Sequence, residues 1–325
     1  MQVSPSVRAV QVPETNPMHP QFTTIYLVGR GQVLTIDSGP DEERYRWMLR
    51  GYLAATEKAE IAHCALTHYH SDHSANLRWI CDEFEAEAIV SRATAERIPD
   101  RLPQRVQQFD DGHEIDLERA PRLRVISTPG HSPDSVCFYL EDEGVLFTGD
   151  TVLGASTTAV QDLGAYLDSL RRLRDLPNLR VICPGHGPII HDPVAYIDGY
   201  IRHREQRERE ILAALADGGA LTSWEIMERL YAHIDPRLRR LADANVRTHL
   251  AKLAQEGRLR VHPGKRRPRS PQDEARARAE EQERDEVLRR AEEYREQARR
   301  RALFLQENPP TEEWLEPPRY EIAPD

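Results

Sequence analysis

The chain has 325 residues, of which 39% are hydrophobic, and its 44 Lys and Arg against 54 Asp and Glu give a formal net charge of -10. This length suffices for one domain of about 200 residues and a smaller companion. No window approaches the ~20 apolar residues of a membrane span. The N-terminus also lacks a basic region followed by an apolar stretch. We therefore expect a cytoplasmic protein with no membrane partner.

The hydrophobic pattern predicts strands that alternate irregularly with helices over the first 215 residues. The predicted strands cover residues 22–28, 32–37, 61–66, 87–90, 122–128, 136–141, 144–149 and 179–183. The predicted helices cover residues 41–56, 161–175 and 193–215, and another opens at Asp72. Such an alternation is typical of a layered α/β fold.

The four cysteines, Cys64, Cys81, Cys137 and Cys183, are widely spaced and form no C-x-x-C pair. Three of them lie in or beside apolar runs, which predicts buried free thiols. Free thiols are typical of the reducing cytoplasm.

Residues 67–73 read Thr-His-Tyr-His-Ser-Asp-His and directly follow an apolar run. Four side chains that can bind a metal therefore lie within six positions. His68 and His70 face the same side of an extended chain, because side chains alternate with a period of two. If a helix begins after them, Asp72 and His73 face a second point nearby. This one short segment predicts ligands for two metals.

Three further segments each place one candidate ligand just beyond a predicted strand, beside Gly or Pro residues that let the chain turn sharply. These ligands are His131 in Thr-Pro-Gly-His, Asp150 in Thr-Gly-Asp and His186 in Pro-Gly-His. One Gly-His or Gly-Asp alone is usually only a turn, but the cluster followed by His, Asp and His is not expected by chance. Imidazole and carboxylate ligands fit zinc or iron in a hydrolytic site better than a cysteine-rich structural site.

These motifs resemble the metallo-β-lactamase superfamily over roughly residues 20–200. The resemblance implies a four-layer αβ/βα sandwich of two mixed sheets, with helices outside and metals at one edge. It implies a first metal held by His68, His70 and His131, a second held by Asp72, His73 and His186, and Asp150 as the bridge. The implied cofactors are two Zn²⁺ ions, with Mn²⁺ or iron as alternatives. Such ions lower the pKa of a shared water to about 7, so that hydroxide forms at neutral pH.

Three residues of these motifs carry further predictions. Asp72 is the candidate catalytic residue, which would orient the hydroxide and pass its proton toward the leaving group. Asp37 lies in a segment that resembles the strand-end aspartate motif of the family, and we predict that it orients a metal ligand. With Asp150 as a bridge, the ligand arrangement resembles that of glyoxalase II and ribonuclease Z. True metallo-β-lactamases lack a bridging carboxylate at this position, so antibiotic hydrolysis is not expected. A mononuclear iron persulfide dioxygenase is a minor alternative.

A different module follows the break at residues 217–219, so we divide the chain into a catalytic domain at 1–215 and a winged-helix-like domain at 216–262. The module resembles the small winged-helix domain of one branch of the superfamily, typified by the lactamase-beta-like endoribonuclease. Its predicted elements are a helix capped by Thr222 with Glu225 three residues later, a helix from about Pro236, a helix over 244–257 and a wing strand at 259–261.

Winged helices often bind DNA, and four cations of this module could contact phosphate, namely Arg247, Lys252, Arg258 and Arg260. However, residues 1–209 are acidic and residues 210–262 are nearly balanced in charge. Binding of a polyanion depends on concentrated positive charge. We therefore favour a module that packs beside the metal cleft and shapes substrate access, with nucleic-acid binding as the alternative.

From Pro263 the composition changes to a charged extension at residues 263–325. Residues 273–307 are almost entirely Glu, Arg, Ala and Gln, which predicts a solvated helix. The Pro-rich segment 309–320 is predicted to be extended. We expect the extension to be solvated or to mediate homo-oligomerisation, with a partner-binding arm as the alternative.

Together the motifs predict a dinuclear-zinc hydrolase that uses a metal-bridging hydroxide to cleave a small ester, thioester or lactone. The alternative is a metal-dependent endoribonuclease that acts on single-stranded RNA, as the winged-helix resemblance suggests. A non-catalytic nucleic-acid-binding or scaffold protein would not need the full ligand set. The acidic charge favours a small-molecule substrate over RNA.

Overall fold

The computed structural model of the chain describes residues 1–13, 22–56, 59–116, 122–267, 308–310 and 313–324. It divides into two compact units, Met1–His203 and Arg204–Asp325, and each is described by itself. The helix predicted at 273–307 lies outside the described residues. Among the helices that are described, none is long and apolar enough to cross a membrane.

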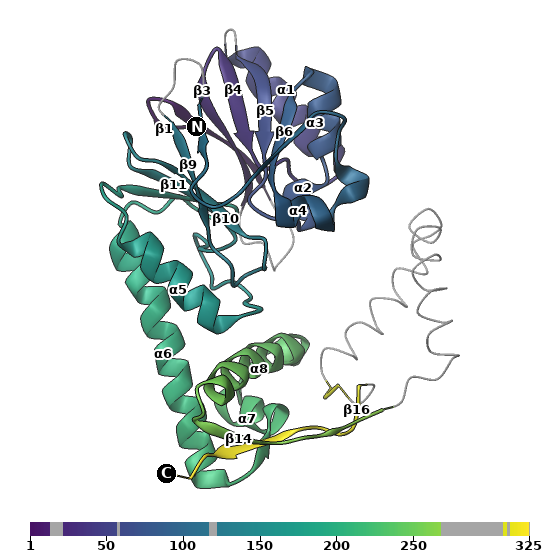
Figure 1. Cartoon of the computed structure of the whole chain (residues 1–325), viewed down its shortest axis with the longest axis vertical. Helices are drawn as coiled ribbons and strands as arrows, with labels where there is room; N and C mark the ends of the chain where they lie inside the picture. The colour runs from purple at the N-terminus through teal and green to yellow at the C-terminus, as the bar shows by residue number, and fades with distance from the viewer. Residues whose placement is uncertain (14–21, 57–58, 117–121, 268–307, 311–312, 325) are drawn as a thin grey trace. The chain divides into compact units, whose positions relative to one another are not determined.

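A seven-stranded sheet, in the order β1-β2-β3-β4-β5-β6-β7, forms one layer of the first unit (Figure 1). The strands are β1 (Gln2–Ser4), β2 (Val7–Pro13), β3 (Phe22–Arg30), β4 (Gln32–Ile36), β5 (Glu60–Ala65), β6 (Glu87–Ser91) and β7 (Val106–Phe109). The pairs from β1 to β4 are antiparallel, and those from β4 to β7 are parallel. The carboxyl ends of β4 and β5 therefore meet at one edge of the sheet.

A five-stranded sheet, in the order β12-β11-β10-β9-β8, forms the second layer. The strands are β8 (Glu114–Ile115), β9 (Leu123–Ser127), β10 (Val136–Leu140), β11 (Val145–Gly149) and β12 (Val181–Pro184). β11 and β12 are parallel, and the other pairs are antiparallel. All residues of β10 and β11 are buried, which explains why both read as continuous apolar runs rather than as alternating ones.

The two sheets pack face to face around a shared core that includes Tyr26 and Leu34 from one sheet and Phe138 and Phe147 from the other. The rings of Tyr26 and Phe147 meet edge to face, with centroids 5.2 Å apart. Fully burying one such large side chain contributes about 1.5–3 kcal/mol. This core holds the two sheets together face to face.

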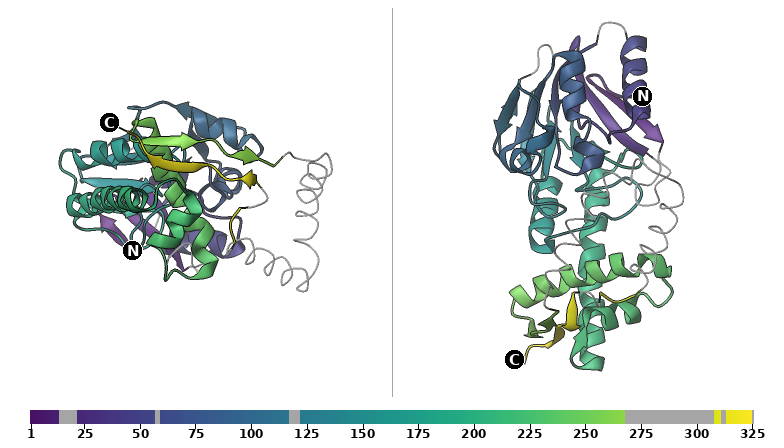
Figure 2. Two further views of the ribbon diagram at one scale, coloured as in Figure 1. Left: turned by 90° about the horizontal axis from the view of Figure 1, so that it is seen from below. Right: turned by 90° about the vertical axis from the view of Figure 1, so that its right-hand side faces the viewer.

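Helices cover the outer faces of both sheets (Figure 1, Figure 2). The outer core of the seven-stranded sheet includes residues from α1 (Glu43–Ala55) and α3 (Leu77–Phe84). The outer core of the five-stranded sheet includes residues from α5 (Leu163–Arg174) and α6 (Pro193–Gly218). The order helix, sheet, sheet, helix confirms the predicted four-layer αβ/βα sandwich.

Several short elements were not predicted from the sequence. The predicted strands do not include β1, β2, β7 or β8. The predicted helices do not include α4 (Arg92–Arg97). β7 and β8 have only four and two residues, which is too short for a clear hydrophobic period. The helix predicted to open at Asp72 is two helices, α2 (Ser71–Ser74) and α3.

The second unit contains the predicted winged-helix elements. They are α7 (Ser223–Leu230), α8 (Arg239–Gln255) and β14 (Leu259–His262). The helices predicted from Pro236 and over 244–257 are one helix, α8, preceded by the 3-10 turn η2 (Pro236–Leu238), and the strand β13 (Leu221–Thr222) was not predicted. Thr222 accepts a hydrogen bond from the Glu225 N–H, and the Glu225 side chain accepts one from the Thr222 N–H, which confirms the capping box. Ile226, Val246 and Leu250 are fully buried in the core of this unit.

The last two described strands pair with strands of the winged-helix unit, in two separate sheets. β17 (Arg319–Ile322) lies between β13 and β14, and β16 (Trp314–Glu316) pairs with β15 (Lys265–Arg266). The sequence predicts a separate extension from residue 263, whereas these pairings join residues 314–322 to the winged-helix unit. The paired strands are about fifty to a hundred residues apart in the sequence. Such pairings leave no local signal, so hydrophobic periodicity does not reveal them.

Candidate metal centre

Turns after four strands bring the predicted ligands together at adjacent edges of the two sheets. β5 leads into His68 and His70, and then α2 carries Asp72 and His73. The other three ligands follow β9, β11 and β12. All seven predicted ligands lie in two groups, which are His68, His70, His131 and Asp150, and Asp72, His73, Asp150 and His186. Within each group, one ligand atom from every residue lies within 4.8 Å of the others.

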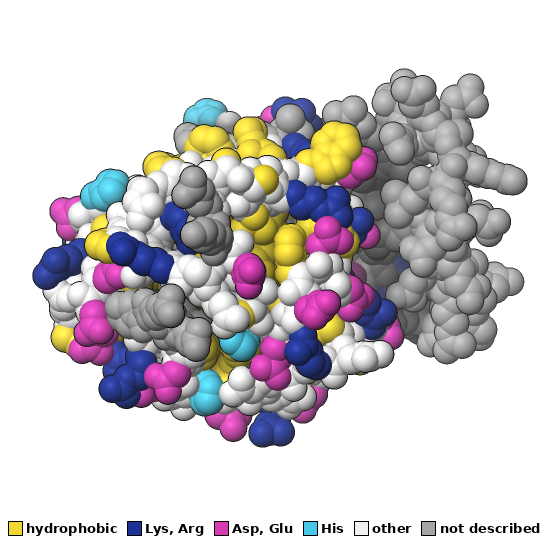
Figure 3. Space-filling model, turned by 90° about the horizontal axis from the view of Figure 1, so that it is seen from above, with side chains coloured by type: hydrophobic (Ala, Val, Ile, Leu, Met, Phe, Trp, Pro, Cys, Tyr) yellow, Lys and Arg dark blue, Asp and Glu magenta, His cyan; other side chains and the backbone are white. Residues whose placement is uncertain are grey.

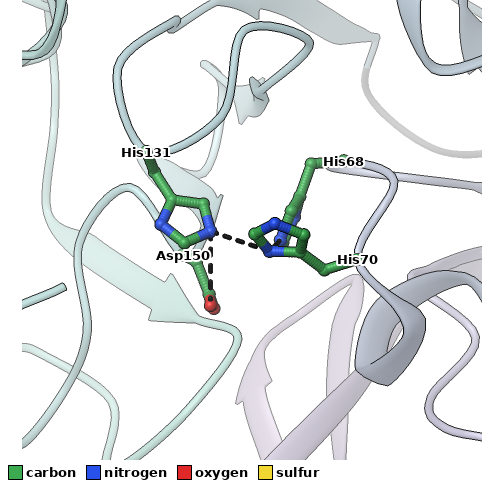
Figure 4. Close-up of side chains that lie close together, drawn as sticks. All are labelled: His68, His70, His131 and Asp150. Carbon is green, nitrogen blue, oxygen red and sulfur yellow. Dashed lines mark hydrogen bonds and ion pairs between the residues drawn. The ribbon is translucent and has the colours of Figure 1, made fainter. Parts of the chain in front are cut away.

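The first group presents three ring nitrogens to one point (Figure 4). His70 Nδ1 lies 2.9 Å from His68 Nε2 and 3.0 Å from His131 Nε2. His131 Nε2 lies 3.7 Å from Asp150 Oδ2. His70 thus contributes Nδ1, whereas the other two rings contribute Nε2.

The second group combines two ring nitrogens with two carboxylates. His73 Nε2 lies 3.2 Å from His186 Nε2. Asp72 Oδ2 lies 3.1 Å from His186 Nε2 and 3.4 Å from His73 Nε2. Asp150 Oδ1 lies 3.2 Å from His73 Nε2 and 3.4 Å from His186 Nε2. This group carries more negative charge than the first, because Asp72 belongs to it alone.

Asp150 faces both groups with different oxygens, Oδ2 toward the first and Oδ1 toward the second. Its Oδ1 is buried and accepts no hydrogen bond from the described residues. A buried carboxylate oxygen without a donor is costly unless a cation or another donor compensates it. The set of five imidazoles and two carboxylates, with its lone pairs converging on two points, fits a pair of divalent metal ions.

Hydrogen bonds behind the rings determine which nitrogen faces each group. Thr67 Oγ1 donates to the Asp37 carboxylate, so it accepts from His68 Nδ1, which lies 3.0 Å away. His131 Nδ1 donates to the Ala159 carbonyl oxygen at 2.8 Å. In both rings Nδ1 carries the hydrogen, and the lone pair of Nε2 is directed into the group. Such outer contacts orient ligands in metalloproteins.

Asp37 has the orienting position predicted for it. Its Oδ2 accepts a hydrogen bond from His73 Nδ1 at 2.8 Å, and its Oδ1 accepts one from the Thr67 N–H at 2.8 Å. Asp37 is 3% exposed and belongs to neither ligand group. Its backbone has φ +63°, a left-handed conformation that Asp tolerates better than most residues.

Thr23 and Thr158 also contact ligand rings, although neither was predicted from the sequence. Thr23 Oγ1 lies 2.9 Å from His186 Nδ1, and Thr158 Oγ1 lies 2.9 Å from His131 Nδ1. Thr23 lies in β3 of the other sheet, 163 positions from His186. A lone threonine gives no sequence signal for such a role, because only tertiary packing brings it to the ring.

Gly185 allows close packing beside the second group. A Cβ on Gly185 would lie 2.6 Å from His73 Cε1 and 3.0 Å from Asp150 Oδ1. The first distance is shorter than any normal carbon contact. The Pro-Gly-His motif therefore has a steric reason for its glycine, in addition to the turn that the sequence indicates.

The electrostatics of the site favour the metal-binding forms of His68 and Asp150 but not that of His73. Burial lowers the pKa of His68 well below its ordinary value, and the charge of His73 adds to this effect. Burial raises the pKa of Asp150, but the charges of His73 and His186 outweigh it and hold that pKa well below its usual range. Neutral imidazole and ionised carboxylate are the forms that act as ligands. Burial lowers the pKa of His73, but the charges of Asp150 and Asp72 outweigh it and raise that pKa well above its ordinary value, so a metal ion would have to displace a proton from this ring.

Comparison with known families identifies the fold of the first unit. Residues 19–186, which include all seven ligands, match the family described as the metallo-beta-lactamase superfamily. The chain belongs to the metallo-beta-lactamase superfamily. Residues 222–266 match a second family, the beta-lactamase associated winged helix domain. As a member of this superfamily with the ligand groups described above, the protein is a metal-dependent hydrolase.

Two relatives match most of the length of the chain. It is 36% identical over 239 residues to the beta-lactamase-like protein 2 homolog of Caenorhabditis elegans, which covers 73% of this chain and 80% of that protein. It is also 36% identical over 244 residues to the atrochrysone carboxyl ACP thioesterase of Aspergillus fumigatus, covering 70% of this chain and 75% of that one.

Solved structures of the superfamily share the fold. A metallo-beta-lactamase family protein of Thermus thermophilus superimposes with a TM-score of 0.65 at 26% identity, over 80% of this chain and 96% of that one. A beta-lactamase domain protein of Burkholderia ambifaria gives a TM-score of 0.70 at 21% identity, over 81% and 89% of the two chains. The second likeness is one of fold alone.

Proposed function

We propose that the protein is a dinuclear hydrolase of thioesters or other small esters, with zinc as its metal. His68, His70 and His131 would hold one ion, Asp72, His73 and His186 the other, and Asp150 both. Two bound divalent ions supply a nucleophile from water at neutral pH and polarise the oxygen of the group under attack. The position of Asp150, with one oxygen toward each group, is the observation that carries the dinuclear proposal.

Asp72 is the proposed proton carrier in this reaction. Its side chain is 20% exposed, whereas that of Asp150, the other carboxylate of the second group, is 11% exposed. It is therefore the carboxylate of the second group that solvent and substrate can approach. Burial raises the pKa of Asp72, but the charge of His73 and the hydrogen bond from His186 outweigh it and lower that pKa below its ordinary value. An ionised Asp72 can orient water and pass a proton to the leaving group.

The cations of the winged-helix unit are paired with carboxylates, which favours an ester over RNA as the substrate. All four cations that could contact phosphate form ion pairs with carboxylates of the same unit, at N···O distances of 2.7–3.7 Å. The pairs are Arg247 with Asp243 and Glu313, Lys252 and Arg258 with Glu208 and Glu256, and Arg260 with Glu321. A phosphate would have to displace these carboxylates.

The overall charge of the chain supports the same choice. On the face shown in Figure 3, Lys and Arg side chains are interspersed with Asp and Glu, and hydrophobic side chains lie between them. The whole chain has a formal net charge of -10. Binding of a polyanion depends on a concentrated positive surface. The thioesterase name of one relative also supports a thioester substrate.

Parallel assays of zinc-loaded protein test this function. A series of acyl thioesters, simple esters and lactones is compared with labelled single-stranded RNA, at roughly 50 and 200 mM salt. We expect turnover of a thioester or ester that changes little with salt and is abolished in His70→Ala. RNA cleavage that weakens strongly with salt, with no ester turnover, would establish the endoribonuclease alternative instead.

Two further properties are proposals with simple tests. The four cysteines are free and buried. Free thiols are typical of the reducing cytoplasm, so the first proposal is a cytoplasmic location, which localisation of a tagged protein tests. Self-association through residues 263–325 is tested by light scattering of the full chain and of a variant that lacks residues 270–305. A monomeric full chain would contradict self-association.

A further inference from the structure

Residues 154–159 form a loop that runs from one ligand group to the other. At one end the Gly154 N–H donates to the His186 carbonyl oxygen at 2.9 Å. At the other end Thr158 Oγ1 lies 2.9 Å from His131 Nδ1. His131 belongs to the first group and His186 to the second. The loop is therefore attached to both groups through their own residues.

The backbone of this loop is also fixed to α6. The Tyr200 hydroxyl donates to the Ser156 carbonyl oxygen. It also lies 3.0 Å from the Leu153 nitrogen and 3.1 Å from the Leu153 carbonyl oxygen. The Tyr196 hydroxyl donates to the same carbonyl oxygen at 3.1 Å. These contacts fix the path of the loop without using the side chains at positions 155–157.

Those three side chains are exposed and lie close to the ligands. Ala155, Ser156 and Thr157 are exposed, whereas Thr158 is buried. Each of the three is within two residues of Gly154 or Thr158, so at most about 7 Å of extended chain separates it from an attachment point. Side chains this close to both groups are within reach of the part of a substrate that extends away from the reacting atoms.

The loop is neutral and its side chains are small. Residues 153–160 read Leu-Gly-Ala-Ser-Thr-Thr-Ala-Val and contain no charged residue. No side chain of the loop can balance the charge of a substrate carboxylate or phosphate, because none of them is a cation. Small side chains leave room for an alkyl chain. The loop thus suits a neutral, extended acyl group.

We propose that Ala155, Ser156 and Thr157 form the rim that contacts the acyl chain and that they select long neutral acyl groups. This proposal rests on the proposed esterase function, since it names the substrate class of the same site. A bulky residue on the rim should exclude long chains and spare short ones. One methylene in a pocket changes discrimination by about 10–200-fold, so the effect is measurable.

Binding of alkyl hydroxamates tests the rim without relying on turnover. The hydroxamate group binds metal ions through two oxygens, and acetohydroxamate and octanohydroxamate differ only in chain length. Affinities for zinc-loaded wild type, Ser156→Trp and Thr157→Trp are measured by calorimetry. We expect each variant to reduce the octanohydroxamate to acetohydroxamate affinity ratio about tenfold or more. Zinc content and melting temperature should stay at the wild-type values.

A matched control is Ala54→Trp, which adds the same side chain at an exposed position of α1 and should leave the affinity ratio unchanged. If Ser156→Trp and Thr157→Trp leave the ratio at the wild-type value, or weaken both ligands equally, the rim proposal is wrong. Thioester turnover by wild type is measured separately. Absence of turnover together with a changed hydroxamate ratio would overturn the proposed function and leave the rim in place.

Discussion

Asp37 and His73 are 36 positions apart in the sequence, and a 2.8 Å hydrogen bond from His73 Nδ1 to Asp37 Oδ2 joins them behind the metal centre. The same carboxylate accepts hydrogen bonds from Thr67, whose hydroxyl lies 3.0 Å from His68 Nδ1. One buried side chain therefore orients a ring in each ligand group. Loss of its charge should weaken both groups without removing a ligand.

Asp37→Asn should reduce metal affinity about 10–100-fold, which is the usual cost of losing an outer contact to a ligand. Asn has nearly the same shape and also tolerates the left-handed backbone at this position, so the fold should persist. Competition with a chelator measures the affinity, and circular dichroism checks the fold. Asp168→Asn is the control, because its side chain is 79% exposed on α5. Wild-type affinity in Asp37→Asn would contradict the role of Asp37.

Metal analysis tests the dinuclear centre. Purified protein reconstituted with zinc should hold about two ions per chain, because two ions separated by about 3.5–4 Å can share one bridging carboxylate. Asp150→Ala should hold one ion or none and should lose turnover, since this side chain belongs to both groups. Near-normal turnover in Asp150→Ala, or a single ion in wild type, would contradict the dinuclear assignment.

Substitution of Gly185 tests the packing of the second group. Gly185→Ala should displace His73 and Asp150 and reduce zinc affinity, because the new Cβ would lie 2.6 Å from the His73 ring. Gly51→Ala is the matched control. A Cβ at Gly51, within α1, meets no atom within 4 Å, so this change should stabilise the protein by about 0.5–1 kcal/mol. Equal zinc affinities in both variants would show that the site tolerates the contact.

Two deletions test the position of the final strand. Removal of residues 313–325 should destabilise the second unit, because β17 pairs with both β13 and β14. Replacement of residues 270–305 with a short Gly/Ser linker should preserve it, since the Arg267 N–H donates to the Glu313 carbonyl oxygen at 3.0 Å and holds the two ends together. Calorimetry distinguishes these results. Zinc content should be normal in both variants, because all seven ligands precede residue 193.

The acid response of the second unit should depend partly on Glu225. Burial raises the pKa of Glu225, but hydrogen bonds from Thr222 and the charge of Arg319 outweigh it and lower that pKa below 4.5. The ionised form therefore stabilises the folded state above pH 4.5, and this contribution is lost as the pH falls through the lower folded value. Glu225→Gln should lower the melting temperature at pH 7, and the difference from wild type should shrink below pH 4.5. A pH-independent difference would contradict this account.

The local sequence predicts the layered fold and the seven ligands because each depends on short-range chemistry. Continuous apolar runs predict β10 and β11, since strands buried on both faces need apolar side chains throughout. The crowding of His68, His70, Asp72 and His73 has few alternatives to metal binding. The capping box at Thr222 likewise depends on residues only three positions apart.

Tertiary structure alone decides the features that join distant segments. Thr23 reaches His186 because β3 and the turn after β12 are neighbours in space, which no periodicity encodes. β17 pairs with β14 across about sixty residues, and Arg247 and Arg260 form ion pairs with carboxylates near the end of the chain. Sequence shows that a charge is present, but only packing determines whether that charge is available to a phosphate, because an ion pair depends on distances that the order of residues does not fix.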